Sequence, residues 1–491
     1  MTATPTDRSR WVALVVLCAG MLMIILDQTI VNVALPTIQS DLGFSQSSLA
    51  WVINAYLIAL GGLLLLAGRM GDLLGRRRVF LAGLALFTLA SLLCGVSQTE
   101  EMLIGARFVQ GIGAAMASAV ILGMIVTMFP QPREQAMAIG IYSFVASAGA
   151  SIGLLAGGLI TQAINWHWIF FVNLPIGLAA AVLAVRVLEP DEGLGLREGA
   201  DVAGASLVTA ALMLGVYTIV GTVDHGWASA HTLGFGAAAV VLLAGFVARQ
   251  ATASRPLVPL RIFRSRNVSG ANVVQALMVA GLFGMFFMGT LYLQRVLGYD
   301  AVQTGAAFLP VSIGIGVLSL GFSARLITRL GARTVLLPGL VALVAGLVLL
   351  TGVPVGGDYV TDLLPALVLI GVGAGLAFPS LVTLAMSGAT PEDSGLASGL
   401  VNTTQQVGGA LGLAVLATLS SSRSNHLLDD GESAASALTG GYHLAFGIGA
   451  GLVVAAIVVA AAVLRSEQVA ALEAAPAEQH PAAEVAYSEA A

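Results

Sequence analysis

The sequence contains no lysine, so all 21 of its basic residues are arginine. The common nucleotide-binding loop G-x-x-x-x-G-K-[ST] requires a lysine, and its absence disfavours ATP-driven chemistry by this chain. Only two cysteines are present, and Cys18 and Cys94 both stand inside apolar runs without metal-ligand or redox spacing. We find no catalytic constellation, and we therefore expect no enzyme, no metal site and no cofactor.

Charged residues are also scarce, at 10% of the chain, whereas hydrophobic residues make up 57%. A soluble domain of ordinary composition carries about 25% charged residues. Apolar runs of about 18 residues or more, long enough to cross a bilayer as a helix, recur along almost the whole chain. These features predict an all-α integral membrane protein that contacts the lipid bilayer and offers no surface for nucleic acid.

The apolar runs predict fourteen transmembrane helices. They cover residues 11–36, 49–68, 79–97, 102–128, 137–161, 168–188, 203–221, 232–249, 268–291, 302–323, 333–352, 363–387, 394–419 and 442–464. The first run is too long for a removable signal peptide and lacks a convincing cleavage site, so we interpret it as a retained first span.

The positions of the arginines test this topology, because positively charged loops stay on the cytoplasmic side. If the N-terminus is cytoplasmic, fourteen spans put all but three of the arginines at cytoplasmic loops and span ends. Arg295 and Arg423 fall outside, and Arg107 lies within the fourth span. We therefore predict that both termini are cytoplasmic.

The chain is predicted to fall into five parts. A cytoplasmic N-terminus at 1–10 precedes a six-helix bundle at 11–188. A linker with two additional transmembrane helices at 189–267 leads to a second six-helix bundle at 268–464. The tail at 465–491, rich in Ala, Glu and Pro, is expected to be disordered and cytoplasmic.

An internal repeat supports two related bundles. "GRMGDLLGRRR" at 68–78 follows the second span, and "ARLITRLGARTV" at 324–335 follows the tenth. Both keep a glycine and flanking arginines at the same offsets, but Thr328 stands where the first copy has Asp72. We expect the first copy to join two helices over about ten residues. A parallel repeat of six-helix bundles is typical of alternating-access carriers.

Four motifs resemble one family, the major facilitator superfamily, and within it the fourteen-span drug:proton antiporters. "GRMGDLLGRRR" is similar to the loop motif between spans two and three, and "LIGARFVQGIGAA" at 103–115 to the fourth-span motif. "LDQTIVNVALP" at 26–36 resembles the first-span motif of the drug-exporting branch, and "WHWIFFVNLPIG" at 166–177 the start of its sixth span. The resemblance extends to about residue 465.

The resemblance implies an inner gate formed by Gly68, Asp72, Gly75 and Arg76. In this family Asp72 would face the N-terminus of the thirteenth span near Ser394, where the partial positive charge of a helix end favours an acid. The alternative is that the arginines of this loop only fix the topology. That alternative does not explain why an acid stands at position 72.

The fifth span departs from the family's antiporter motif G-x-x-x-G-P-x-x-G-G. It reads "GASIGLLAGG" and retains Gly149, Gly153, Gly157 and Gly158, but Leu154 replaces the proline. The glycine spacing predicts a gating role, or equally a small-residue surface for close helix packing. A second departure is His167, where relatives commonly carry arginine.

Asp27 is the only acid that we place in the core of a span, and Arg107 is the only base there. Helix geometry puts Asp27 about 14 Å and Arg107 about 8 Å below the outer membrane surface, within reach of an arginine side chain. Desolvation favours a neutral Asp27, whereas a nearby Arg107 favours the carboxylate, so the pair is suited to load and release a proton. The alternative is a static buried ion pair.

Polar residues elsewhere in the spans are candidates for lining a central cavity, or for hydrogen bonds between helices. They are Asn32, Asn54, Gln110, Tyr142, Asn402, Gln405 and Gln406. We predict a monomeric, multi-pass exporter in the cell membrane that uses protons to expel small amphipathic drugs or antibiotics. The alternatives are a proton symporter that imports a small nutrient and a membrane sensor without transport activity.

Overall fold

The computed structural model describes residues 7–129, 131–191, 193, 195, 200–254, 256–387 and 394–465. Regular structure within these ranges is entirely helical. The first helix group contains α1 (Asp7–Leu42), α2 (Trp51–Leu74), α3 (Arg76–Gly95), α4 (Glu100–Met128), α5 (Pro132–Ala163), α6 (Trp168–Phe171) and α7 (Asn173–Val187). It is followed by α8 (Val202–His225) and α9 (Ala230–Thr252).

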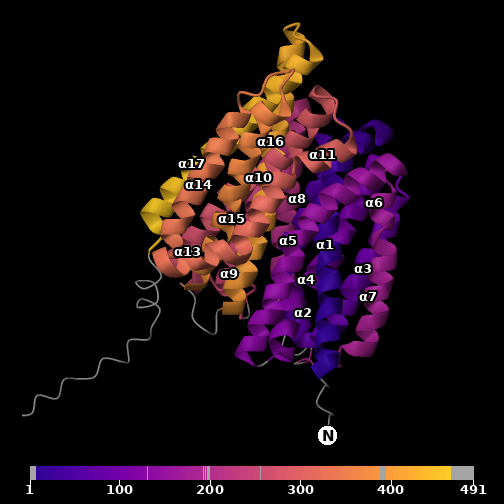
Figure 1. The fold of residues 1–491 in the computed structure, drawn as a ribbon, viewed down its shortest axis with the longest axis vertical. Coiled ribbons are helices and arrows are strands. Elements are labelled where there is room, and N and C mark those ends of the chain that lie inside the picture. Colours follow the sequence, from indigo (N-terminus) through magenta and orange to yellow (C-terminus); the bar gives the residue numbers. More distant parts are fainter. Residues whose placement is uncertain are drawn as a thin grey trace, which may run out of the picture.

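The second helix group contains α10 (Arg266–Leu291), α11 (Ala301–Ala307), α12 (Leu309–Val317), α13 (Ser323–Leu330), α14 (Ala332–Leu350), α15 (Leu364–Ser387), α16 (Ser394–Asp429) and α17 (Ala434–Val463). Short turns at Tyr292–Val296, Leu318–Phe322 and Tyr359–Leu363 are π-helical. In Figure 1 the two groups lie on opposite sides, with α8 between them.

Eleven helices within the described residues are long and apolar enough to cross a membrane, and two shorter apolar stretches cover Ile152–Ala163 and Ala301–Val317. The predicted all-α membrane fold is therefore confirmed. The number of fourteen spans, the cytoplasmic side of both termini and the division into five parts stay predictions. Residues 1–6 and the tail from 466 onward lie outside the described residues.

The loop predicted over 68–78 is a single residue. α2 continues to Leu74 and α3 begins at Arg76, so only Gly75 separates them. Gly75 has a φ of 98°, a value that glycine adopts without the steric cost other residues pay. Gly331 makes the same one-residue turn between α13 and α14 with a φ of 84°. The predicted ten-residue loop is wrong. Apolar composition identifies only the part of a helix that crosses the hydrocarbon, whereas α2 and α3 continue beyond that part with polar residues.

Two predicted spans are interrupted by short breaks. The sixth span divides into α6 and α7 at Val172, and the tenth divides into α11, α12, a π-helical turn and α13. Pro310 occupies the first turn of α12, where its missing N–H costs nothing. The first span also differs from expectation, because α1 continues through Pro36 to Leu42.

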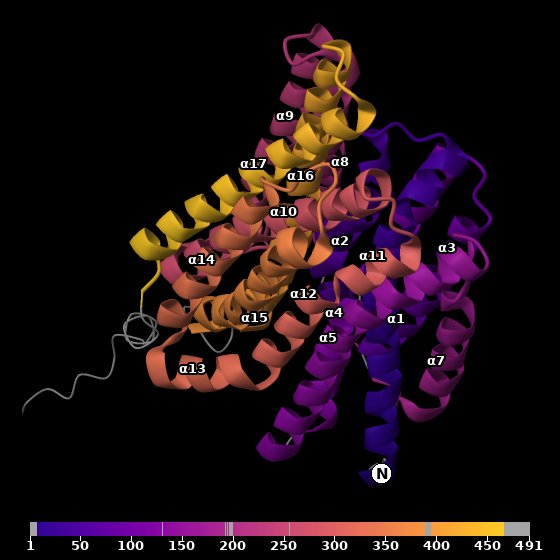
Figure 2. The ribbon, with the colours of Figure 1, turned by 45° about the horizontal axis from the view of Figure 1, so that its top comes forward.

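A buried polar cluster joins α8 to α9. Asp201 caps α8 by accepting from the Gly204 N–H, and it also accepts from Arg249 Nε at 2.5 Å and Gln250 Nε2 at 2.9 Å. Burial acts to raise the pKa of Asp201, but the hydrogen bonds from Arg249, Gly204 and Gln250 outweigh it and lower the pKa. Asp201 therefore holds the two helices together at one end as a carboxylate. Figure 2 shows α8 and α9 beside α16. α8 contacts both α2 and α16.

Replacing Asp201 with Ala is expected to destabilise the protein by about 2 kcal/mol, because it removes a helix cap and two charge-assisted hydrogen bonds. The measurement is the midpoint of thermal unfolding in detergent. Asp224→Ala, an exposed acid at the other end of α8, is the matched control and should leave the midpoint in place. Equal midpoints for the two variants would show that the cluster does not stabilise the fold.

Candidate functional site

Asp27 and Arg107 form an ion pair inside the first helix group, with side chains that are 0% and 1% exposed. Arg107 Nη1 donates to Asp27 Oδ2 at 2.5 Å and to Gln110 Oε1 at 2.6 Å. The other carboxylate oxygen, Asp27 Oδ1, accepts from Gln110 Nε2 at 2.7 Å and from Asn173 Nδ2 at 3.0 Å. Four residues from α1, α4 and α7 thus make one network.

Helix spacing explains how this network assembles. Arg107 and Gln110 are three residues apart and therefore lie on one face of α4, toward α1. The Tyr56 ring of α2 covers the guanidinium with its centroid at 4.3 Å, and the Phe170 ring lies at 5.8 Å. These rings separate the ion pair from water. A desolvated acid beside a fixed positive charge is a common arrangement for a group that changes protonation.

Sequence reasoning predicted Asp27 and Arg107 together, and the structure brings them together. It places Gln110, predicted in the cavity, in the ion-pair network instead. It also adds Asn173, which sequence reasoning missed although the residue stands in the apolar motif at 166–177. An asparagine inside an apolar run was the available signal.

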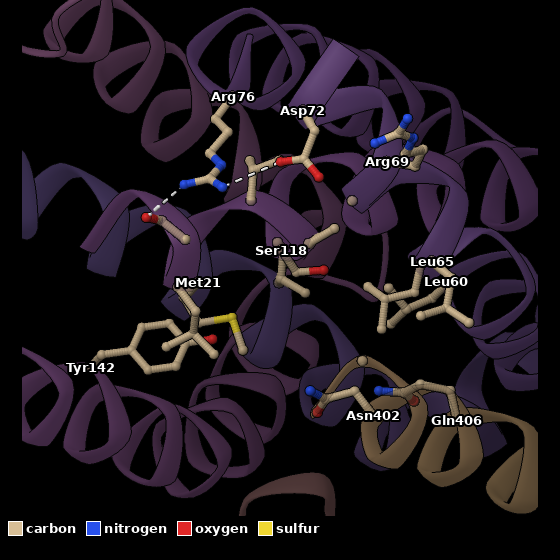
Figure 3. Close-up of a pocket in the computed structure, with 18 of the residues that line it drawn as sticks. Met21, Leu60, Leu65, Arg69, Asp72, Arg76, Ser118, Tyr142, Asn402 and Gln406 are labelled. Atoms are coloured by element: carbon tan, nitrogen blue, oxygen red, sulfur yellow. Dashed lines mark hydrogen bonds and ion pairs between the residues drawn. The ribbon is translucent and has the colours of Figure 1, made fainter. Parts of the chain in front are cut away.

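A cavity of about 450 Å³ (Figure 3) is lined in part by Ile24, Ile25 and Gln28, the neighbours of Asp27 on α1. Its walls come from α1, α2, the start of α3, α4, α5 and α16, together with the connection between α9 and α10. The lining residues are Met21, Ile24, Ile25, Gln28, Leu60, Leu64, Leu65, Gly68, Arg69, Asp72, Arg76, Ser118, Ala119, Val120, Leu122, Gly123, Tyr142, Leu257, Gly399, Asn402 and Gln406. This volume is in the range of small-molecule sites.

Three of the predicted cavity residues, Tyr142, Asn402 and Gln406, line this cavity. In Figure 3 the amides of Asn402 and Gln406 lie on the wall across from Asp72 and Arg76. The walls between them are mostly apolar, with Gln28, Ser118 and Tyr142 as the polar exceptions, so the cavity suits a compound with a large apolar body and few polar groups.

The other predicted cavity residues do not line it. Asn32 Nδ2 donates to the Gln28 carbonyl on its own helix. Asn54 is fully buried within α2, and Gln405 Oε1 accepts from Gln275 Nε2 at 3.5 Å. Their role as cavity-lining residues stays a prediction, and Gln405 matches the alternative of a hydrogen bond between helices. The presence of polar residues in a span does not reveal which way the helix is rotated.

The predicted gate residues lie where the cavity reaches the end of α2. Gly68, Asp72 and Arg76 line the cavity. Asp72 Oδ1 pairs with Arg76 Nη2 at 3.2 Å, and Arg76 Nη1 donates to the Gly123 carbonyl at 3.0 Å. The side chain of Ser394, the partner implied for Asp72, lies outside the described residues, and that contact stays a prediction.

Asp191, which sequence reasoning missed, holds the turn between α2 and α3. Its carboxylate accepts from the backbone N–H of Arg76 at 2.5 Å and of Arg77 at 3.0 Å. A carboxylate at a helix N-terminus is favoured by the helix dipole. The segment that follows α7 thereby fixes the start of α3.

The glycines of α5 make close helix contacts from the middle of the helix toward its C-terminal end. Gly149, Gly153 and Gly157 face α1, and a Cβ at Gly157 would stand 2.6 Å from the Ile30 carbonyl oxygen. Gly158 faces the backbone of Ala301 in α11 instead. Leu154 continues the helix without a break. The glycine motif therefore packs α5 on its own group and also on the second group.

Known proteins share both the sequence and the fold. The family model of the Major Facilitator Superfamily matches residues 17–413. The chain is 40% identical to the puromycin resistance protein pur8 of Streptomyces alboniger, with 91% of this chain and 90% of the relative covered. It is 38% identical to the cephamycin export protein CmcT of Amycolatopsis lactamdurans, with 84% and 85% covered.

Solved structures agree on the fold. A bacterial homologue of the human lysosomal transporter Spinster, in an inward-facing and occupied conformation, matches with a TM-score of 0.65 and 14% identity, covering 93% of this chain and 97% of that one. An auto-inhibited peptide transporter of the POT family matches with a TM-score of 0.67 and 14% identity over 94% and 98% of the chains. The family model over residues 17–413 and the relatives at 40% and 38% identity show that the chain belongs to the major facilitator superfamily and is a multi-pass membrane transporter rather than an enzyme.

Proposed function

We propose that the chain is a fourteen-span, proton-coupled exporter that expels amphipathic drugs or antibiotics across the cell membrane by alternating access. The observation that carries the proposal is the fully buried Asp27–Arg107 pair beside a largely apolar cavity. A buried ionisable residue in a membrane bundle is expensive and usually functional. Relatives named for antibiotic resistance and export favour outward transport of a similar class of compound.

The cavity supports one side of an alternating-access cycle. It extends to the α2–α3 turn, which the arginine distribution assigns to the cytoplasm. At the other end of the helices Gly158 packs on Ala301, and Gln294 Nε2 donates to the Val33 carbonyl at 2.8 Å. Under the proposed topology this is an inward-facing state, in which a substrate enters from the cytoplasm or the inner leaflet.

Proton and substrate would be coupled through α1. Ile24, Ile25 and Gln28 of this helix line the cavity, whereas Asp27 points into the ion-pair network. Protonation neutralises Asp27 and weakens its attraction to Arg107, so the two protonation states favour different arrangements of α1 against α4. A substrate that contacts α1 alters the same balance.

The proton gradient supplies enough energy for export. One proton that crosses a membrane potential of 100 mV yields about 2.3 kcal/mol, which corresponds to a concentration ratio of about fifty. The competing reading, a symporter that imports a polar nutrient, calls for a cavity with several charged groups. Here the charged lining residues Arg69, Asp72 and Arg76 gather at the end of α2, and the walls beyond them are mostly apolar.

The proposed function is tested by ethidium accumulation in cells that lack their own drug pumps. Expression of this chain should lower accumulation severalfold, and a protonophore should restore it. A puromycin-type and a cephamycin-type antibiotic complete the panel. Unchanged accumulation of every compound at verified expression in the membrane would reject export, and protonophore-sensitive uptake of a nutrient would support the symporter.

Asp72→Asn is expected to lower efflux about tenfold without loss of protein from the membrane. The variant keeps the glycine turn but removes the negative charge that holds Arg76 and that the gate requires. The measurement is the initial rate of ethidium efflux at matched expression. Asp191→Asn, which alters the cap of α3 outside the cavity, separates a gating effect from a general loosening of the turn. Wild-type efflux in Asp72→Asn would support the topology-only interpretation of this loop.

A further inference from the structure

In the side-chain amide of Asn173 the nitrogen is hydrogen-bonded and the oxygen is not. This residue begins α7 and is 1% exposed. Its Nδ2 donates to Asp27 Oδ1 at 3.0 Å and approaches Ser91 Oγ at 3.5 Å. Its Oδ1 is buried and has no hydrogen-bond partner. A buried carbonyl oxygen without a partner is costly, so it calls for an explanation.

The neighbouring amide of Gln110 is different, because both of its ends are occupied. Gln110 Oε1 accepts from Arg107 Nη1 at 2.6 Å and from Cys94 Sγ at 3.6 Å. Its Nε2 donates to Asp27 Oδ1 at 2.7 Å and to Ser91 Oγ at 2.8 Å. Reversal of this amide would break a charge-assisted bond to Arg107, so Gln110 is fixed in one orientation.

A protonated Asp27 needs an acceptor, whereas each of its three hydrogen-bond partners presents a donor to it. The ionised carboxylate only accepts, and Arg107, Gln110 and Asn173 all donate to it. The protonated acid is itself a donor. The titratable groups that interact with Asp27 are Arg107 on α4, Tyr56 on α2 and Cys94 on α3. Among them the bonded partner, Arg107, has no acceptor atom.

We propose that Asn173 is a positioning residue whose side-chain amide reverses when Asp27 takes up a proton, so that Asn173 Oδ1 accepts from the new Asp27 O–H. The inference rests on the proposed proton-coupled function. A proton arrives from water and forms a covalent O–H bond on Asp27 Oδ1. The hydrogen bond that Asn173 Nδ2 donated to that oxygen is then replaced by a hydrogen bond that the Asp27 O–H donates to Asn173 Oδ1. Deprotonation reverses both changes. The Asn173 amide then donates to the ionised carboxylate and accepts from the protonated acid, so Asp27 can change between the two protonation states without losing this hydrogen bond.

The test is infrared difference spectroscopy on the full-length protein in lipid, comparing acidic with neutral pH. Asp27→Asn identifies the carboxylic-acid carbonyl band of Asp27 by removing it. In Asn173→Leu this band should shift to higher wavenumber, because the acid has lost a hydrogen-bond partner. The side-chain amide signal that accompanies protonation in the wild type should disappear. Asn173→Thr retains a hydroxyl acceptor and should keep the acid band near its wild-type position.

Asn272→Leu is the matched control. Asn272 is a buried asparagine of α10 that donates to the Val268 carbonyl and, like Asn173, has an unpartnered Oδ1. It lies in the other helix group, so its replacement should leave the Asp27 band unmoved. If Asn173→Leu does not reach the membrane, Asn173→Ala removes the amide without adding apolar bulk and is read in the same way.

The outcome is separable from that of the proposed function. Proton-driven efflux in Asn173→Leu should fall about tenfold, the effect of one lost hydrogen bond, while substrate binding remains. An acid band at the wild-type position in Asn173→Leu, with the amide signal retained, would overturn the assignment to Asn173. An absent Asp27 band in the wild type at any pH would instead contradict proton uptake by Asp27, and with it the proposed coupling.

Discussion

In inverted membrane vesicles, Asp27→Asn is expected to reduce substrate-driven proton movement by about 100-fold or more, the usual effect of removing a proton-transfer group. Asparagine is nearly isosteric and can still accept from Arg107, but it stays neutral at every pH. The amount of protein in the membrane should therefore be unchanged. The measurement is the fluorescence of a pH-sensitive dye in the vesicle lumen after addition of substrate.

Asp41→Asn is the matched control for this experiment. Asp41 lies on the same helix, but its side chain is 55% exposed and it takes no part in the ion-pair network. Its proton signal should stay near that of the wild type. Proton movement of wild-type size in Asp27→Asn would remove this residue from the coupling mechanism and direct attention to acids outside the helix core.

Gly158→Val is expected to keep α5 and α11 apart at the end of the bundle away from the α2–α3 turn. In an alternating-access cycle, opening at that end is accompanied by closure of the cavity at the α2–α3 end. A Cβ at this position would overlap the backbone of Ala301 in the second helix group. Overpacking of this kind costs about 1–3 kcal/mol, which shifts an equilibrium between two conformations by about five- to 150-fold. Because the arrangement described here, which is inward-facing under the proposed topology, is the one penalised, transport should fall strongly while the protein still folds.

The shift is measured by thiol labelling of Ser118→Cys, a position that lines the cavity. Both natural cysteines are buried, so the introduced one should dominate labelling. Gly158→Val should slow the reaction about tenfold or more. Gly105→Val is the control, since a Cβ at Gly105 of α4 would meet no atom within 4 Å. Equal labelling rates with and without Gly158→Val would show that the α5–α11 contact does not close the outer side.

The features that sequence reasoning predicted correctly depend on local composition. Apolar length identifies a membrane helix whatever surrounds it, and a lone acid and a lone base in such helices have few partners other than each other. The pairing of Asp27 with Arg107 follows from this scarcity. The positions of the helix ends could not be predicted from apolar composition, because α2 and α3 both include polar residues and are separated only by Gly75.

The features that sequence reasoning missed depend on contacts between distant segments. Asn173 lies 146 residues from Asp27 along the chain, and Asp191 lies 115 residues from the amide of Arg76 that it caps. A single asparagine or aspartate has no pattern that indicates such a partner. The rotation of each helix, which decides whether residues such as Asn54 and Gln110 face the cavity, is likewise set by packing along the whole length of the helix.

The connection between α9 and α10 has a consequence for how this transporter could change the range of small molecules that it accepts. Leu257 of this connection lines the cavity, and Val258 packs with Ala397 and Leu400 of α16 while its N–H is held by Gln250. Part of the cavity wall is therefore supplied by a segment that we predict to lie outside both copies of the repeat. Substitutions there can reshape the wall without disturbing the ion pair or the Asp72–Arg76 contact, which would leave substrate recognition and the proposed energy coupling free to evolve separately.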